Sequence, residues 1–136
     1  MTKVFNSLDE IQKYYNEETN SYIFKEYGMY INLVIFNFDL NIKSNIYAWN
    51  IYGKNINALN IDAKDIYACR LDVNDIKVHD ISALSINANN ISYYAVCYAY
   101  ENIKCKSIKG RKHNSKHFVL DGKLEVLGQW SKNFII

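Results

Sequence analysis

The residues best suited to specific chemistry in this sequence are basic and gather near its C-terminal end. Between positions 104 and 117 the chain carries six lysine or arginine side chains and two histidines. Cationic side chains at this density could contact a phosphate backbone or an acidic protein surface. They could equally form a solvated edge that keeps strands from pairing end to end. The candidate contact residues are Lys104, Lys106, Lys109, Arg111, Lys112 and Lys116.

A second group of candidate contact residues is aromatic and consists of Tyr47, Trp49, Tyr52 and Tyr67. We expect all four to face solvent, and exposed aromatic side chains of this kind suit a protein interface. They could also stabilise the strands by stacking across them, or be covered by the segment that precedes the repeats. A coil of four sides would place Tyr47 and Tyr67 in one stack.

Metal binding and catalysis have little support in the sequence. Cys97, Cys105, His113 and His117 are ligand types, but the seven residues between the cysteines exceed the short knuckle of zinc sites. No nucleophile elbow, phosphate loop or metalloprotease motif is present, and His79 is the only histidine of the repeats. We therefore expect no metal, no cofactor and no enzymatic activity.

The candidate residues are positioned by a repeat with a period of five residues. From Ser44 to Tyr98 the template is x-(Asn/Asp)-Ile-x-(Ala/small). A period of five fits neither a helix nor an ordinary strand, so it implies a coil of short, equivalent sides. In extended chain, the aliphatic residue and the small residue two positions later point the same way, so both should face inward. The aliphatic positions are Ile46, Ile51, Ile56, Ile61, Ile66, Leu71, Ile76, Ile81, Ile86, Ile91 and Val96.

The number of sides follows from the sizes of the small inward residues. Stacking at twenty residues sorts them into two alanine columns and two columns that widen towards Tyr93 and Tyr98. We therefore expect four sides, with three sides as the alternative. The polar residue before each aliphatic position suits a repeated corner, because Asn and Asp side chains bond nearby backbone amides. The seven residues from Val96 to Ile103 indicate a two-residue insertion.

The segment before the repeats, residues 1–43, is expected to cap one end of the solenoid. Ser7 and Glu10 form a capping box that predicts a helix over 7–18. Alternating apolar residues predict one strand over 34–42, with the even-numbered side chains buried.

The segment after the repeats is expected to cap the other end, within one domain that spans 1–136. The solenoid would extend over 44–110, followed at 111–136 by a basic loop, a β-hairpin and a C-terminal tail. The hairpin is predicted over 118–126, where Asp121-Gly122 separates two apolar runs.

The repeat resembles that of the pentapeptide-repeat family over residues 44–98, with a weaker continuation to 110. The resemblance implies an all-β fold, a quadrilateral β-helix that here would have about three coils, and a role in binding a macromolecule. Bactofilin-like solenoids, which polymerise, are a competing resemblance. The residues that carry the match are the pairs Asn50-Ile51, Asn60-Ile61, Asp65-Ile66 and Asp80-Ile81.

The charge distribution narrows what the resemblance implies. Some pentapeptide-repeat proteins imitate duplex DNA, which requires a strongly negative surface. The net charge is −2 over 1–43, −1 over 44–98 and +5 over 99–136. DNA mimicry is therefore disfavoured.

We expect a protein-binding module, as a phage or mobile-element inhibitor or modulator of a host nucleic-acid-processing enzyme. Direct nucleic-acid binding through 104–117 and self-association into a structural solenoid are the alternatives.

The cysteine count and the N-terminal residues indicate the compartment. Three cysteines form no disulfide framework, which is typical of a reducing environment. Asp9, Glu10 and Lys13 interrupt any signal-peptide core, and no apolar run approaches the ~20 residues of a membrane span. We expect a cytoplasmic protein without membrane contact.

Overall fold

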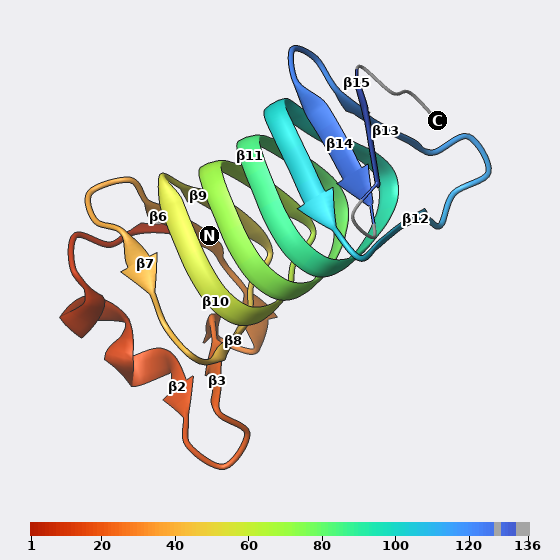
Figure 1. The fold of residues 1–136 in the computed structure, drawn as a ribbon. Helices are drawn as coiled ribbons and strands as arrows, with labels where there is room; N and C mark the ends of the chain where they lie inside the picture. Colours follow the sequence, from red (N-terminus) through yellow and green to blue (C-terminus); the bar gives the residue numbers. More distant parts are fainter. Residues whose placement is uncertain (127–128, 133–136) are drawn as a thin grey trace.

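The chain folds into a β-solenoid of stacked parallel strands (Figure 1). The computed structural model describes residues 1–126 and the backbone of 129–132. The elements before the repeats are β1 Thr2–Val4, the 3₁₀ helix η1 Leu8–Tyr14, β2 Tyr15–Asn16, β3 Ser21–Ile23, β4 Lys25–Glu26, β5 Met29–Tyr30, β6 Asn32–Ile35 and β7 Leu40–Asn41. The repeats form β8 Asn45–Tyr47, β9 Asn50–Gly53, β10 Asn55–Asp62 and β11 Asp65–Cys105, which winds through several sides. The last elements are β12 Ser107–Gly110, β13 Lys116–Val119, β14 Lys123–Val126 and β15 Gln129–Lys132.

Each coil of the solenoid takes fifteen residues, so it has three pentads and three sides. Ile61 pairs with Ile46 on one strand and with Ile76 on the next, and Ile66 pairs with Ile51. The prediction of four sides is therefore wrong. The predicted number of about three coils was derived from four sides, so it is wrong as well. Ile and Ala side chains fill the narrow three-sided interior, whereas a wider coil lined by the same residues would leave cavities, which are costly.

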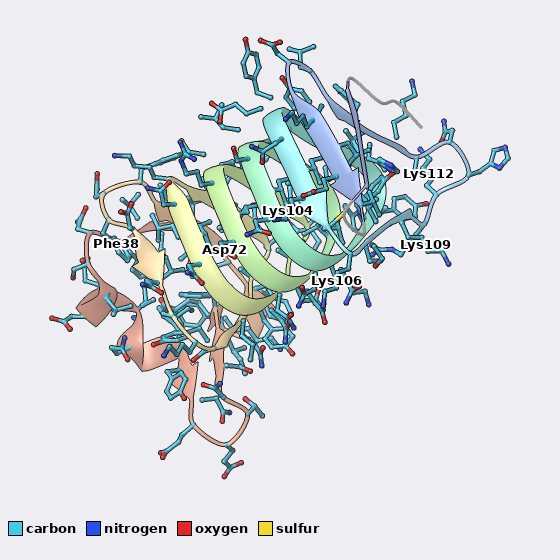
Figure 2. The ribbon with its side chains drawn as sticks, viewed as in Figure 1. Phe38, Asp72, Lys104, Lys106, Lys109 and Lys112 are labelled. Atoms are coloured by element: carbon cyan, nitrogen blue, oxygen red, sulfur yellow. The ribbon has the colours of Figure 1, made fainter. Side chains whose placement is uncertain are left out.

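The inward positions of the pentads are as predicted from Ile46 to Tyr93. Ile56 and Ala58 are both buried, and the same holds along the other sides except at Ala68, which is partly buried. Residues between them, such as Asp72, stand on the outer surface (Figure 2). The core therefore runs along the solenoid axis as a continuous cluster of aliphatic side chains.

The two-residue insertion is confirmed by the register beyond the repeats. Ile91 pairs with Ile108, seventeen residues later rather than fifteen. The shift begins earlier than predicted, because Val96 is 37% exposed and Cys97 takes the inward position with 0% exposure. The prediction that Val96 faces inward is wrong.

The N-terminal segment is part of the solenoid rather than a separate cap. β3, β6 and β7 pair in parallel with β8, β9 and β10 and so form an irregular coil of their own. The predicted strand over 34–42 is wrong, since Leu33 and Ile35 are buried and a turn leaves Phe36 52% exposed. From Leu40 onward the even-numbered residues Leu40 and Ile42 are buried, as predicted.

The predicted helix is shorter than expected and forms a 3₁₀ helix, η1. Ile11 and Tyr14 are its buried residues. The Glu10 carboxylate accepts hydrogen bonds at 3.2 Å from the backbone N–H of Asn6, while the Ser7 side chain makes no capping bond. The predicted capping box is therefore not formed, because Glu10 bonds the residue before Ser7 rather than Ser7 itself.

The predicted hairpin over 118–126 is also wrong. β13 and β14 both run parallel to β11, on two different sides, so they extend the solenoid. Asp121-Gly122 forms the corner between them, where a Cβ on Gly122 would lie 1.5 Å from the backbone oxygen of Glu101. The antiparallel pair at this end is β14 with β15, and the predicted tail at 133–136 lies outside the described residues.

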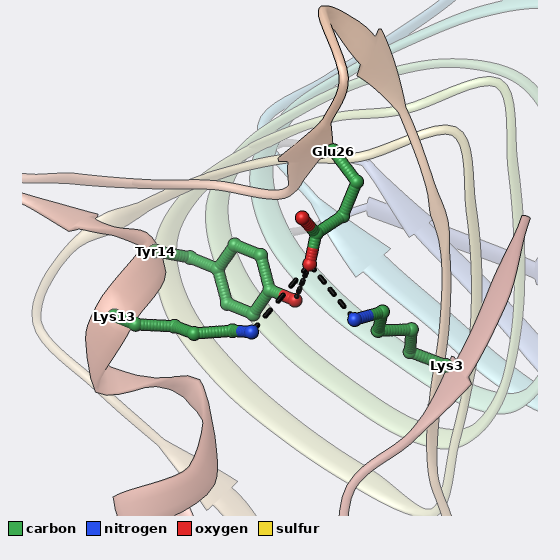
Figure 3. A network of polar contacts seen from close by, with 4 residues as sticks. All are labelled: Lys3, Lys13, Tyr14 and Glu26. Atoms are coloured by element: carbon green, nitrogen blue, oxygen red, sulfur yellow. Dashed lines mark hydrogen bonds and ion pairs between the residues drawn. The ribbon is translucent and has the colours of Figure 1, made fainter.

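Glu26 joins three N-terminal elements through its carboxylate (Figure 3). One carboxylate oxygen accepts a hydrogen bond from the Tyr14 hydroxyl at 2.7 Å and pairs with Lys3 Nζ at 2.9 Å and Lys13 Nζ at 3.5 Å. The hydrogen bonds from Lys3 and Tyr14 lower the pKa of Glu26 from 4.5 to about 2. β1, η1 and β4 are tied together by this one group.

A Glu26→Gln variant is expected to be less stable than the wild type at neutral pH and equally stable near pH 2. The folded-state pKa lies below the unfolded one, so the stabilisation is present above about pH 4.5 and is lost as the pH falls towards about 2. Urea unfolding of both proteins across this range measures the difference. A stability difference that does not change with pH would contradict the role of the ionised carboxylate, and added salt should reduce the effect.

Candidate functional site

The polar corner residues form hydrogen-bonded ladders along the outside of the solenoid. Asn60 Nδ2 donates to Asn45 Oδ1 at 3.0 Å, and Asn90 Nδ2 donates to Asp75 Oδ1 at 2.8 Å. The Asp75 backbone N–H donates to Asn60 Oδ1 at 3.1 Å, so these bonds form one column, which Ser107 continues by donating to Asn90 at 2.7 Å. Residues fifteen apart are stacked neighbours, so this column stabilises the corners.

On one side of the solenoid, aromatic side chains from successive coils also stack on one another along the outer surface. The outward residues of this side, which we call the aromatic face, are Val34, Tyr52, Tyr67, Ser82, Tyr98 and Phe118. The Tyr52 and Tyr67 rings stack with centroids 5.2 Å apart and planes 6° apart. The Tyr98 and Phe118 rings lie 4.9 Å apart. Two aromatic stacks thus flank the single small residue of the face, Ser82.

A groove of about 390 Å³ opens at Ser82 between the two stacks. Its floor is small, with Gly53 and Ala83, and its walls are aromatic or aliphatic. None of the residues that line it is charged. The wall residues with the largest exposure are Phe36 at 52%, Tyr67 and Tyr100 at 42%, and Leu84 at 40%.

The four predicted aromatic contact residues do not form one surface. Tyr52 and Tyr67 lie on the aromatic face, whereas Tyr47 and Trp49 line a different groove on another side. The predicted stack of Tyr47 on Tyr67 is wrong, because residues twenty apart are on different sides. Tyr98, predicted to face inward, instead lies outward between the buried residues Cys97 and Ala99.

Of the residues that line the groove at Ser82, the sequence analysis named only Tyr67 as a contact residue. Those it missed include Ser82 itself and the large side chains Phe36, Leu84, Tyr98 and Tyr100. The missed signal was the spacing of fifteen, which places Ser82 one strand beyond Tyr67 and would have shown the gap in the aromatic column.

The predicted basic residues are spread over the C-terminal part of the solenoid rather than joined in one cluster (Figure 2). Lys104 pairs with Glu125 at 3.8 Å. Arg111 differs from its neighbours, because its guanidinium folds back and donates to the backbone oxygen of Val78 at 2.8 Å. The remaining predicted basic residues, Lys106, Lys109, Lys112 and Lys116, have exposed side chains.

The cysteines and histidines of the C-terminal part occupy structural positions. Burial raises the pKa of the Cys97 thiol and raises that of Cys105 to about 11, so both are protonated at neutral pH. His117 is buried with Nδ1 2.7 Å from the Tyr93 hydroxyl, and burial lowers its pKa. His113 is exposed. Across the described residues, no group of three or more His, Cys, Asp or Glu side chains is placed to hold a metal ion.

Comparisons of the chain with protein-family models, with curated proteins and with solved structures return no match. The pentapeptide-repeat resemblance therefore stays a prediction from the repeat itself. In the part of the chain that the structure describes, no helix is both long and apolar enough to span a bilayer.

Proposed function

We propose that this protein is a non-catalytic module that binds another protein through its aromatic face. The observation that supports this is the groove at Ser82, which lies one strand from Tyr67 and one strand from Tyr98. Neighbouring rings on this face are separated by 4.9 to 5.2 Å. A ring inserted at the level of Ser82 would therefore stack on an aromatic side chain on each side, a favourable geometry for aromatic pairs.

The chemistry of the groove favours a protein side chain over a nucleobase as its occupant. Sites for nucleic acid combine aromatic platforms with cations that contact the phosphates. The groove at Ser82 has no charged residue in its lining. We infer a partner that presents an aromatic side chain from an apolar surface, which the exposed Phe36, Leu84 and Tyr100 would contact around the groove.

We infer the class of partner from the five-residue repeat. Its resemblance to pentapeptide-repeat proteins supports a nucleic-acid-processing enzyme of a host as the target, with this chain as a phage or mobile-element inhibitor or modulator. Contact through an apolar groove needs no imitation of DNA, which agrees with the nearly neutral repeats.

The test is a variant that fills the groove. Ser82→Trp should weaken partner binding at least about tenfold, because its own ring occupies the space of the incoming one. Asn57→Trp is the matched control, since Asn57 is exposed at the same pentad position on another side. Affinity purification with crosslinking identifies the partner from the wild type, and titration with the purified partner compares the three proteins.

Two outcomes would reject the proposal. One is equal binding of the partner to Ser82→Trp and to the wild type. The other is the absence of any specific partner together with a concentration-dependent mass in sedimentation that Ser82→Trp abolishes, which would assign the groove to self-association.

A further inference from the structure

A second groove, of about 260 Å³, lies at the corner where the side that carries Tyr47 ends. We call it the basic groove. It differs from the groove at Ser82 because cations and aromatic rings line it together. Its side chains able to bind a ligand are Tyr47, Trp49, Lys64, Lys77, His79 and Arg111.

Arg111 is held over the basic groove by neutral groups. Its guanidinium donates to the Val78 oxygen at 2.8 Å and to the Ser92 oxygen and Oγ at 3.1 and 2.8 Å. A guanidinium has five N–H donors, so these bonds fix its position and leave donors for a ligand. Val78 and Ser92 belong to successive coils, and Arg111 reaches them from the loop after β12.

The positive charge of the basic groove is not neutralised by ion pairs. Within the part of the chain that the structure describes, Arg111, Lys64 and Lys77 form no ion pair with a carboxylate, unlike Lys3, Lys13 and Lys104. Asp62 is the single carboxylate in the lining, against three cations from Lys64, Lys77 and Arg111. Outside the lining, the Asp65 carboxylate interacts electrostatically with Lys64 and His79. The excess of positive charge that an anionic ligand would balance is therefore carried mainly by Lys77 and Arg111.

An aromatic platform lies two strands away from the Arg111 anchor. Trp49 is 48% exposed, and Lys64 Nζ lies 5.2 Å from the centroid of its ring. The backbone N–H of Lys64 bonds to the Trp49 oxygen, and that of His79 bonds to the Lys64 oxygen, both at 2.7 Å. Trp49, Lys64 and His79 thus lie at the same corner in three successive coils. Coils are stacked at the strand spacing, so Trp49 and Val78 are about 10 Å apart along the solenoid axis.

We propose that the basic groove binds one nucleotide, with the phosphate on Arg111, Lys64 and Lys77 and the base stacked on Trp49. A fixed guanidinium binds phosphate oxygens through charge-assisted hydrogen bonds, and a base is a planar group that an exposed indole binds by stacking. The volume is below the ~300–1,000 Å³ of most small-molecule sites, which fits a single nucleotide better than a dinucleotide. The nucleotide could be free or part of a single strand.

The inference differs from nucleic-acid binding by the whole basic segment. It requires Arg111 and the repeat residues Lys64, Lys77 and Trp49, and it does not require Lys106, Lys112 or Lys116. It is also independent of the aromatic face, so Ser82→Trp should bind nucleotide as the wild type does.

Calorimetric titration at low ionic strength tests the proposal with a nucleoside 5′-monophosphate, the matching nucleoside, inorganic phosphate and a hexanucleotide. We expect the monophosphate to bind at least about tenfold more tightly than nucleoside or phosphate alone, because only it uses both halves of the groove. Tighter binding of the hexanucleotide would identify a single strand as the source, and equal binding would identify the free nucleotide.

Variants separate the groove from the general basic surface. Arg111→Gln and Lys77→Gln should each weaken binding about tenfold, and Trp49→Leu should remove the advantage of the monophosphate over phosphate. Lys112→Gln is the matched control, because Lys112 is exposed and adjacent to Arg111, and it should change affinity less than about twofold.

Thermal unfolding checks that Arg111→Gln is folded. If it is not folded, Lys77→Gln tests the same groove without changing the hydrogen bonds of Arg111. Equal losses from Lys112→Gln and Lys77→Gln, or no binding of the monophosphate, would overturn the proposal.

Discussion

Replacing Tyr93 with alanine is expected to lower the free energy of unfolding by about 3–5 kcal/mol. Tyr93 is fully buried and is the largest member of an inward column that begins with Ala48, Ala63 and Val78. Its hydroxyl lies 2.7 Å from Nδ1 of the buried His117. Truncation would leave a ring-sized cavity at the end of the core and remove this hydrogen bond.

Tyr94 offers a matched control for this prediction, because it is the next residue and is 42% exposed. Tyr94→Ala should cost less than about 1 kcal/mol. Tyr93→Phe keeps the ring and should lose about 1–3 kcal/mol, because the buried His117 Nδ1 loses the hydroxyl as its partner. Urea unfolding followed by circular dichroism measures all three. Similar losses of unfolding free energy for Tyr93→Ala and Tyr94→Ala would show that packing of the Tyr93 ring in the interior does not stabilise this part of the core.

Truncating a central isoleucine should have an effect of similar size. Ile66→Ala is expected to cost about 2–5 kcal/mol, because Ile66 has no exposed surface and pairs with Ile51 in the middle of the stack. Neighbouring coils cannot close the resulting cavity without giving up their own strand pairing.

Leu59→Ala removes a side chain of the same size from a 40% exposed corner, and its expected cost is below about 1 kcal/mol. Chemical unfolding of both variants compares inward and corner positions directly. If Leu59→Ala were as costly as Ile66→Ala, the assignment of inward positions from the pentad would be wrong.

Some of the residues in these predictions could be assigned to the interior from the five-residue period of the sequence alone. Ile66 and Tyr93 follow from the period of five, because two positions within one extended pentad face the same way whatever the rest of the chain does. The insertion before Ile103 follows as well, since it breaks that period.

The groove residues could not be identified in this way. Tyr67, Ser82 and Tyr98 are distant in sequence, and they become neighbours only if a coil closes after three sides. The same holds for Arg111, which donates to Val78 thirty-three residues earlier. The predicted hairpin at Asp121-Gly122 failed for a related reason, because strand partners on β11 were available to both of its arms.

The amino-acid sequence alone was therefore enough to identify the solenoid and the residues that line its interior from Ile46 to Tyr93. Those features depend on the direction of side chains within five consecutive residues. The length of the coil, and with it the identity of every outward neighbour, was settled by the packing of the whole interior, in which Ile and Ala fill three sides. Both proposed binding surfaces are sets of outward neighbours, so only the tertiary structure could assemble them.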